Sequence, residues 1–292
     1  MPTMPEWLGV LIAFIYGTVV GSFLNVCIWR LPRDESIIQP GSHCPHCQTL
    51  LRPWDLIPLF SFLLQRCRCK YCGAPISWRY FGVELITGIY FALTYHWFGP
   101  RAGYPPYWIV DFFAYALFGA SLIAIFFIDL EHYIIPDQLS LFGIAVGFLH
   151  DVVKIITGTH QLAKVPIPFT SLKIPLPASV VGIVVCGGSF LLLAIVSYYV
   201  FRKEAMGGGD IKLAAAIGAN VALGAAMLSF LLAVFIGGII GIGLIVFGKK
   251  TRKDYVPFGP MMVAGAFIVV FYGTDLLRLF EYYVCNYIYT AY

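Results

Sequence analysis

Two aspartates, Asp129 and Asp210, stand at the ends of long apolar stretches, where carboxylates are rare. Asp129 closes the run Phe-Phe-Ile-Asp, and Asp210 follows the three glycines 207–209. An acid inside a membrane costs several kcal/mol, so it is a functional hypothesis by default. Two carboxylates that share a site hold one proton between them, because both cannot ionise cheaply. Such a pair offers a general base and a general acid, with which an aspartic peptidase could add water to a peptide bond.

Other interpretations of the same acids stay open. A bare Gly-x-Gly-Asp match also fits a helix N-terminus with Asp210 as its cap. Asp137, which follows Pro136, fits the first residue of a helix and is a further candidate acid, whereas Glu131 and His132 fit the membrane interface. Intramembrane acids also form the proton or ion pathways of transporters. A proton-coupled transporter and a membrane anchor for a metal module are therefore the alternatives to an enzyme.

Four cysteines form two C-x-x-C pairs, Cys44-Pro-His-Cys47 and Cys69-Lys-Tyr-Cys72, with 21 residues between them. Each pair can present two thiolates to one tetrahedral ion, and two such pairs predict a structural zinc site. The surrounding segment cannot easily build its own core, so a metal would supply folding free energy. A reduced, metal-free loop and a redox pair are the alternatives. Further ligand candidates in this segment are Cys67, His43 and His46.

The composition indicates a membrane protein. Of the 292 residues, 60% are hydrophobic and 12% charged, and the mean hydropathy is +0.83; a soluble domain is nearer half apolar and a quarter charged. Apolar stretches of this length cross a bilayer as helices, which satisfy their own backbone groups. We predict an all-α polytopic membrane protein with about eight transmembrane helices and a small cytoplasmic zinc-binding segment. The predicted spans are Trp7–Trp29, Phe81–Phe98, Tyr107–Ile128, Leu139–Ile156, Ala178–Phe201, Ile211–Phe247 divided in two near Asn220–Gly224, and Met261–Phe280.

Basic residues predict the orientation, since cytoplasmic loops are enriched in lysine and arginine. The first span is followed by Arg30 and Arg33 and has no basic stretch before it, so we expect no cleaved signal peptide. The 30–80 segment and the basic residues at 202–203 and 249–253 are expected in the cytoplasm, with the N- and C-termini outside. The proline-rich 157–177 stretch is predicted as an outer loop. The net charge of +4 gives little support for nucleic-acid binding, and we predict no such partner.

These residues resemble the bacterial type IV prepilin peptidases, relatives of the wider GxGD membrane proteases that include presenilin. The similarity covers nearly the whole chain, and the motifs occur in the family's order. They are Gly21-Ser-Phe-Leu-Asn25-Val-Cys-Ile-Trp-Arg30-Leu-Pro32, the four cysteines, Cys72-Gly-Ala-Pro-Ile-Ser-Trp-Arg-Tyr80-Phe-Gly-Val-Glu84, the Asp129 segment, Gly207–Lys212 and Pro257-Phe-Gly-Pro260. The departures from the family pattern are Glu131 for a frequent aspartate, Gln65 for a usual glycine, Phe81 for a common proline, and the extra thiol Cys67.

The resemblance implies two activities in the bacterial inner membrane. The first is cleavage of type IV prepilins and pseudopilins after a glycine that ends a short basic leader, at the cytoplasmic face. By motif match, Asp129 and Asp210 form the aspartyl dyad. The second is methylation of the new N-terminal residue with S-adenosylmethionine, and the cysteine-rich segment marks this bifunctional form. A peptidase without methyltransferase activity is the alternative, and the implied partners are the precursors and membrane lipid.

Methyl transfer has one candidate residue, Glu84, which lies just inside the second span and next to the zinc segment. An acid there could accept the ammonium of S-adenosylmethionine or of the new N-terminus. Its alternative interpretation is an acid near a helix N-terminus, favoured by the helix dipole. No G-x-G-x-x-G motif opens a βαβ unit, so the cofactor-binding residues stay unassigned.

The expected organisation has four parts. They are the first transmembrane helix (1–29), the cytoplasmic four-cysteine zinc segment associated with methyl transfer (30–80), transmembrane helices two and three (81–128), and the peptidase core with helices four to eight (129–292). Asp129 then stands at the end of the third helix. The sequence leaves the oligomeric state unknown.

Overall fold

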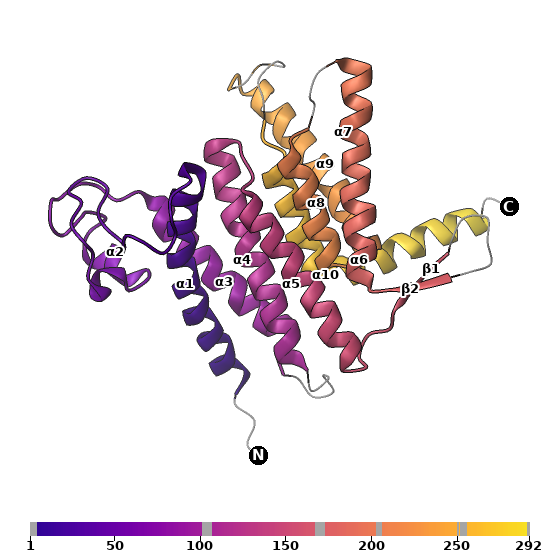
Figure 1. Ribbon diagram of the computed structural model, residues 1–292, viewed down its shortest axis with the longest axis horizontal. Coiled ribbons are helices and arrows are strands. Elements are labelled where there is room, and N and C mark those ends of the chain that lie inside the picture. Colours follow the sequence, from indigo (N-terminus) through magenta and orange to yellow (C-terminus); the bar gives the residue numbers. More distant parts are fainter. Residues whose placement is uncertain are drawn as a thin grey trace. The chain divides into compact units, whose positions relative to one another are not determined.

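The computed structural model describes residues 5–100, 107–166, 173–202, 206–249, 251 and 256–290, without the side chains of residues 166, 201 and 283–290. The chain divides into two compact units, Met1–Ile128 and Asp129–Tyr292, and each is described by itself. Figure 1 gives the order of their elements. Some basic residues on which the predicted orientation rests, Lys203 and Lys253 among them, lie outside the described residues, as does the end of the chain at Tyr292.

The first unit is built on α1 (Glu6–Arg30) and α3 (Trp78–Phe98), which pack against each other along their length (Figure 1). The packing is close enough that a Cβ added at Gly21 of α1 would lie 2.7 Å from the Cα of Glu84 in α3. Small residues allow membrane helices to approach in this way. The long helix α4 (Trp108–His132) contributes its residues up to Ile128 to this unit.

Between α1 and α3 the chain forms a small projecting lobe, residues 34–77, which we call the cysteine lobe (Figure 1). A short helical turn, η1 (Leu31–Arg33), leads into it, and its regular elements are η2 (Pro53–Leu56) and α2 (Phe60–Leu64). Phe62 is the buried side chain of α2, and its ring packs against Trp78 and Phe81 at the start of α3. Aromatic packing therefore fixes α2 to the first turn of α3.

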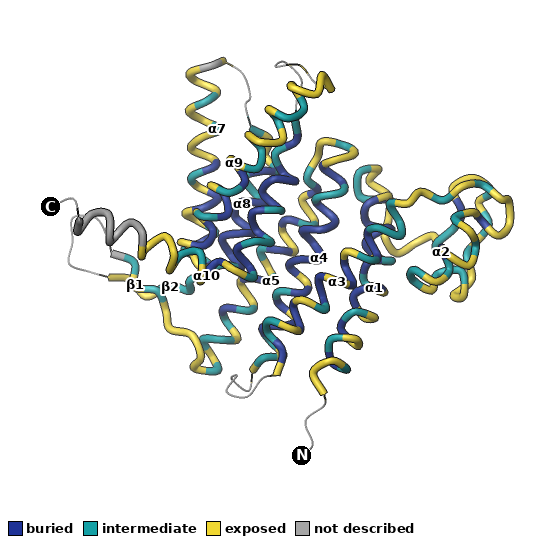
Figure 2. Tube along the Cα trace, turned by 180° about the vertical axis from the view of Figure 1, so that it is seen from behind, coloured by how far each residue is buried: buried dark blue, intermediate teal, exposed yellow. Residues whose placement is uncertain are grey.

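The second unit surrounds a short buried helix, α8. Its elements are α5 (Asp137–Ile156), β1 (Ala163–Pro166), β2 (Lys173–Leu176), α6 (Ala178–Gly182), a π-helical turn η3 (Ile183–Gly187), α7 (Gly188–Phe201), α8 (Gly208–Asn220), α9 (Leu223–Val246) and α10 (Gly259–Thr290). All residues of α8 from Leu213 to Asn220 are buried, as Figure 2 shows in dark blue.

Two contacts hold α8 at its C-terminal end. Gly218 faces Gly182 so closely that a Cβ added at either position would collide with the backbone of the other. The Asn220 amide, which is buried, donates hydrogen bonds of 2.8 Å to the carbonyl of Gly143 in α5 and to that of Ala216. The position of α8 is thus set by backbone contacts as well as by side-chain packing.

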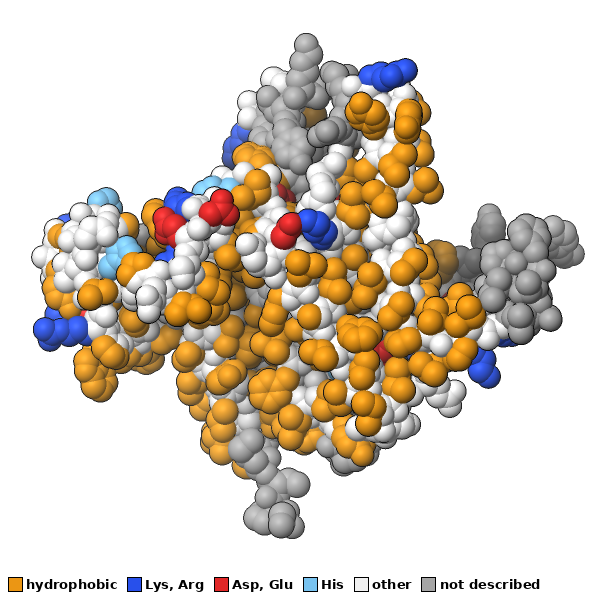
Figure 3. Space-filling view, in the orientation of Figure 1, with side chains coloured by type: hydrophobic (Ala, Val, Ile, Leu, Met, Phe, Trp, Pro, Cys, Tyr) orange, Lys and Arg blue, Asp and Glu red, His pale blue; other side chains and the backbone are white. Residues whose placement is uncertain are grey.

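The prediction of a helical, multi-pass membrane protein is confirmed, but eight spans are not. Among the described residues, 6 helices are long and apolar enough to cross a membrane: Glu6–Arg33, Trp108–His132, Asp137–Ile156, Ala178–Val200, Leu223–Val246 and Gly259–Tyr282. Figure 3 shows hydrophobic side chains over most of the helical surface. The other two expected spans correspond to α3 and α8. At 13 residues, α8 is shorter than the roughly 20 residues that a spanning helix needs.

A second difference concerns the 157–177 stretch, which the sequence predicts as a loop. It contains an antiparallel hairpin in which Ala163 of β1 pairs with Leu176 of β2 and Pro166 pairs with Lys173. Prolines signal loops because they remove a backbone donor, but edge strands tolerate them, and a two-stranded hairpin consists of edges. The predicted break in the long apolar run near 220–224 is confirmed, since α8 ends at Asn220 and α9 begins at Leu223.

Candidate functional site

Three helix ends of the second unit meet at Asp129 and Asp210. Asp129 lies near the C-terminal end of α4, Asp210 lies in the first turn of α8, and both carboxylates are buried. The two interact electrostatically, and the backbone N–H of Gly259, the first residue of α10, donates a hydrogen bond to Asp129. The structure therefore brings together two acids that are 81 positions apart in the sequence. It adds the N-terminus of a third helix to them.

Glycine is required where the helix ends come together. A Cβ added at Gly259 would lie only 2.5 Å from Oδ2 of Asp129 and 3.2 Å from Cδ1 of Ile135. A Cβ added at Gly209 would lie 2.8 Å from the Cβ of Ile135. Ile135 belongs to the short linker between α4 and α5 and touches both glycines. One apolar side chain thus sets the spacing between the starts of α8 and α10.

Asp210 is oriented by its own loop. Its Oδ2 accepts a hydrogen bond of 3.2 Å from the backbone N–H of Gly207, and its backbone N–H donates to the Gly207 carbonyl at 3.2 Å. The N-cap of α8 is therefore Gly207, and Asp210, which the sequence offers as the cap itself, is the third residue of the helix, where its side chain accepts from the N-cap backbone. This hydrogen bond is compatible with catalysis, because the Gly207 N–H occupies only one lone pair of the Asp210 carboxylate and leaves the others for water or substrate. On the open side, a Cβ added at Gly208 would meet no heavy atom within 4 Å.

The other predicted acids of this region have different surroundings. Asp137 begins α5, as the sequence predicts, and its Oδ2 accepts a 2.6 Å hydrogen bond from Nζ of Lys212 in α8. This ion pair is half exposed and links α5 to α8 near their N-terminal ends. Glu131 lies 4.0 Å from His132 at the end of α4, and both are partly exposed. Asp137 thus already has a cationic partner, whereas Asp129 faces another acid.

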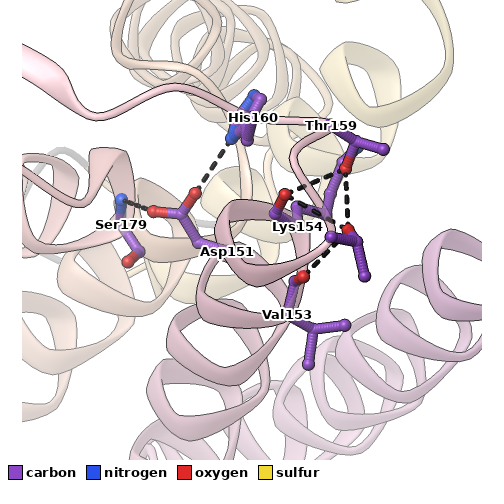
Figure 4. Close-up of polar contacts among 7 residues, drawn as sticks. Asp151, Val153, Lys154, Thr159, His160 and Ser179 are labelled. Atoms are coloured by element: carbon purple, nitrogen blue, oxygen red, sulfur yellow. Dashed lines mark hydrogen bonds and ion pairs between the residues drawn. The ribbon is translucent and has the colours of Figure 1, made fainter.

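A further buried acid of the second unit, Asp151, has a structural environment. Its Oδ2 accepts a 2.8 Å hydrogen bond from the backbone N–H of Ser179 in the first turn of α6, and its Oδ1 lies 2.9 Å from Nδ1 of His160 (Figure 4). It therefore caps α6 from a neighbouring helix. Asp151 follows Asp137 by 14 positions and therefore lies about 21 Å from it along α5. It is therefore remote from the dyad end of α5.

In the first unit, the structure brings the four cysteines of the two pairs together. The Sγ atoms of Cys44, Cys47, Cys69 and Cys72 all lie within 4.8 Å of one another, and those of Cys44 and Cys72 are 3.9 Å apart. Four thiolates about 2.3 Å from one tetrahedral ion would be spaced by about 3.8 Å. The donor set and its spacing therefore fit one metal ion. Among the described residues, this group includes neither Cys67 nor the two histidines that the sequence offers as further ligands, His43 and His46.

The two pairs have the same backbone geometry. In the first, Gln48 N–H donates to the Cys44 carbonyl at 2.8 Å, and in the second, Gly73 N–H donates to the Cys69 carbonyl at 2.8 Å. Gln48 and Gly73 both have a positive φ, of 56° and 71°. Each pair is therefore a tight turn that points two sulfur atoms the same way.

Two of the four thiols are shifted toward the form that binds a metal. Hydrogen bonds with the side chain and backbone of Thr49, whose hydroxyl lies 3.3 Å from Cys47 Sγ, lower the pKa of the Cys47 thiol to about 6. Hydrogen bonds with the backbone of Cys72 and Tyr71 lower the pKa of the Cys69 thiol. The thiolate is the form that binds a metal.

Glu84 is buried between α1 and the cysteine lobe. One carboxylate oxygen accepts a 2.8 Å hydrogen bond from the backbone N–H of Leu59, which caps α2, and the Ser22 hydroxyl of α1 also hydrogen-bonds to this carboxylate. Glu84 occupies the seventh position of α3 and therefore lies beyond its first turn. The alternative of a helix-start acid is thus weakened, and Glu84 instead joins α3, α1 and the lobe.

Several residues stand in sequence motifs that do not reveal their structural roles. The buried guanidinium of Arg30 donates to the carbonyls of Ser36 and Pro40 at 2.9 and 2.7 Å, so Arg30 anchors the start of the lobe and is not simply a charge at a membrane boundary. Gly259 and Ile135 are likewise revealed only by their contacts. A spacing rule cannot find them, because their partners are distant in the chain.

Comparisons with known proteins identify the family of the chain. Residues 15–98 match the model of the bacterial peptidase A24 N-terminal domain, and residues 116–242 match that of the type IV leader peptidase family. A protein of Bacillus subtilis named prepilin leader peptidase/N-methyltransferase is 32% identical over 274 residues, which cover 92% of this chain and 96% of the relative. One of the same name from Aeromonas hydrophila is 30% identical, with 97% and 96% covered.

A third relative of that name, from Myxococcus xanthus, is 34% identical over 82% of this chain, and the match spans 65% of the relative's own length. No solved structure matches the chain significantly. Two family models match the chain in succession, and the Bacillus subtilis and Aeromonas hydrophila relatives are matched over nearly their full length. The chain therefore belongs to the type IV leader peptidase family.

Proposed function

We propose that this chain cleaves the leader peptides of type IV prepilins with Asp129 and Asp210 as its catalytic dyad, and then methylates the new N-terminus with S-adenosylmethionine. The observation that carries the peptidase assignment is the meeting of two buried carboxylates from α4 and α8. Asp137 has a lysine partner and Asp151 caps a helix, so neither offers a second acid pair. Family membership supports the substrate and the reaction.

In the proposed mechanism the dyad shares one proton. The ionised carboxylate takes a proton from water as the water oxygen attacks the scissile carbonyl carbon, while the protonated carboxyl donates to the carbonyl oxygen. The tetrahedral intermediate then collapses, the C–N bond breaks, and the leaving amine takes a proton from the dyad. The Gly207 N–H and the Gly259 N–H each hold one carboxylate in place during these steps.

An extended substrate has room beside Asp210. Gly208 faces open space, so a peptide strand could approach the backbone of the 207–209 loop. Glycine at the cleavage site would help the substrate leave a helical conformation, because glycine has a low helix propensity. The acids Asp129, Glu131, Asp137 and Asp210 would attract a basic leader. We extend this substrate class to pseudopilins.

We assign methyl transfer to the first unit, with Glu84 as its candidate residue. The amine of the processed N-terminus would attack the methyl carbon of S-adenosylmethionine, the thioether would leave, and the ammonium product would lose a proton. Glu84 could accept a cationic group here. Its hydrogen bonds with Leu59 and Ser22 also support a role in positioning the cysteine lobe. The residues that bind S-adenosylmethionine stay unassigned.

We further propose that Cys44, Cys47, Cys69 and Cys72 bind one structural zinc ion. A bound zinc would cross-link the two turns of the lobe, and four protein ligands would leave no open position for catalysis. The peptidase core is assigned to residues 129–292 and the methyltransferase-associated segment to residues 30–80. We infer a location in the bacterial inner membrane, with the catalytic residues near the cytoplasmic face and both termini outside. The basic residues that follow α1 support this orientation.

The test is the intact mass of a full-length model prepilin after incubation with purified protein in lipid and S-adenosylmethionine. Wild type should remove the leader and then add the mass of one methyl group. Asp129→Asn and Asp210→Asn should leave the precursor uncut. Asp151→Asn is the matched control, a buried acid of the same unit that should retain processing, because asparagine can still accept from Ser179.

Each outcome has a separate meaning. A folded wild type that leaves the precursor uncut would refute the peptidase assignment. Cleavage by both dyad variants would refute the choice of residues. If the precursor is cleaved but the product does not carry the added mass of a methyl group, the protein is a peptidase that lacks methyltransferase activity.

A further inference from the structure

The surface of η2 and α2 in the cysteine lobe carries large apolar side chains that no other described residue covers. Phe60, Leu63 and Leu64 are 68%, 55% and 80% exposed, and Trp54 is 78% exposed. On a soluble protein, a contiguous group of this kind marks an interaction surface. Phe62, the one buried side chain of α2, points to the opposite face and packs on α3. α2 therefore has an inner face toward the protein and an outer face that the described part of the chain leaves uncovered.

The depth of α2 along α1 indicates what covers the outer face. Leu59, immediately before α2, hydrogen-bonds to Glu84, whose carboxylate also interacts with Ser22 of α1. Tyr80, next to the aromatic residues on which α2 packs, accepts a 3.0 Å hydrogen bond from Asn25 of α1. The start of α2 therefore lies near the level of Ser22, and the ring of Phe62 lies near that of Asn25.

These levels lie within the span formed by α1. Ser22 is about 12 Å, and Asn25 about 7.5 Å, from the end of α1 at Arg30, at a rise of about 1.5 Å per residue. The headgroup region of one leaflet is only about 5–8 Å deep. If the end of α1 lies at the aqueous edge of the headgroups, α2 reaches the boundary between headgroups and acyl chains.

The charges near α2 agree with a lipid partner. Arg66 and Arg68 follow α2 directly, and both are exposed. Lys70 is exposed as well, while the acid nearest to it, Asp55, is mostly buried and accepts hydrogen bonds within the lobe. Apolar side chains flanked by arginine and lysine are typical of segments that lie in the interface of an anionic membrane. Figure 3 shows both kinds of side chain on the lobe.

We propose that the η2–α2 surface is an interfacial membrane anchor, with Phe60, Leu63 and Leu64 among the lipids of the leaflet that contacts the lobe and Arg66 and Arg68 at anionic headgroups. The four-cysteine cluster is then held at the membrane surface and does not extend freely into water. Lipid contacts would then hold the outer face of the cysteine lobe, while the hydrogen bonds of Glu84 and Arg30 hold the lobe to α3 and α1. This proposal does not depend on either enzymatic activity.

Two added tryptophans test the anchor in the full-length protein. Leu64→Trp adds an indole on the outer face of α2. Ile38→Trp adds one at an equally exposed apolar position of the same lobe: Ile38 is 81% exposed and Leu64 is 80% exposed. Ile38 follows the end of α1, in the loop that Arg30 holds through its carbonyls. Both sites are exposed, so neither change opens a cavity. Each variant is reconstituted into nanodiscs of phosphatidylcholine with phosphatidylglycerol, and the added fluorescence is measured against wild type.

Lipids brominated near the start of the acyl chain, and aqueous iodide, then report where each indole lies. Brominated lipid should quench most of the fluorescence added by Leu64→Trp and little of that added by Ile38→Trp, and iodide should give the reverse order. Equal quenching of both variants by iodide would overturn the proposal. The proposal would also be overturned if the indole of Leu64→Trp were protected from iodide only after a prepilin is added or the protein concentration is raised. Those results would indicate a protein partner or a second copy on this surface.

Discussion

Replacement of Gly259 by alanine should damage catalysis while leaving substrate binding largely intact. The added Cβ would lie 2.5 Å from Oδ2 of Asp129, whereas ordinary van der Waals contacts begin at 3.4 Å. The carboxylate, or the start of α10, would therefore have to move by about 0.9 Å. A misplacement of about 1 Å in a catalytic group can cost roughly 100-fold in rate, or about 2.7 kcal/mol in the barrier.

The assay is steady-state cleavage of a model prepilin in lipid, with kcat and KM measured separately. We expect kcat to fall by roughly 100-fold and KM to change little, because the added Cβ displaces a group of the proposed dyad. Gly241→Ala in α9 is the matched control, since its added Cβ meets no heavy atom within 4 Å. Alanine should slightly stabilise that helix. A Gly259→Ala enzyme with the kcat of wild type would refute the inference that this glycine positions Asp129.

Three further predictions concern the other sites. Glu84→Gln should abolish methylation but retain cleavage, because glutamine still accepts the hydrogen bond from the Leu59 N–H but carries no charge. Both activities are read by intact mass, and loss of both would indicate a structural role only. Cys44→Ser should remove most of the bound zinc, measured per chain by elemental analysis, whereas Cys67→Ser should keep it; equal losses would contradict the four-cysteine site. Asn220→Ala should lower the unfolding free energy in detergent by about 1–3 kcal/mol through the loss of buried hydrogen bonds, and an unchanged unfolding midpoint would contradict the anchoring role of this residue.

The sequence predicts a structural feature well where the residue type and its spacing are compatible with few environments. Two C-x-x-C pairs predict a cluster of four sulfur atoms, and the structure brings these atoms within 4.8 Å of one another. The order of the apolar stretches predicts the helices and the break between α8 and α9. Asp129 and Asp210 stand out in the sequence as candidates because acids are costly in such surroundings, and the structure brings the two together.

The remaining features depend on contacts between distant segments. Hydropathy alone does not distinguish α8 from a spanning helix, because a helix buried in protein and one in lipid are equally apolar. The hairpin in the 157–177 stretch is hidden by prolines that its edge strands tolerate. The partner of Glu84 is a backbone N–H, and no side-chain pattern identifies a backbone donor. Gly259 stands in a motif, but only the path of α10 brings it to Asp129.

The glycine contact between α6 and α8 has a consequence for altering specificity by directed evolution. Positions 182 and 218 admit only glycine, because any side chain at either would meet the backbone of the other. Random libraries that include these positions would consist largely of misfolded members. Diversity is better confined to the entry of α8, where its first residue, Gly208, faces open space beside Asp210. The buried part of the helix that carries Asp210 would then stay constant while the surface at its start varies.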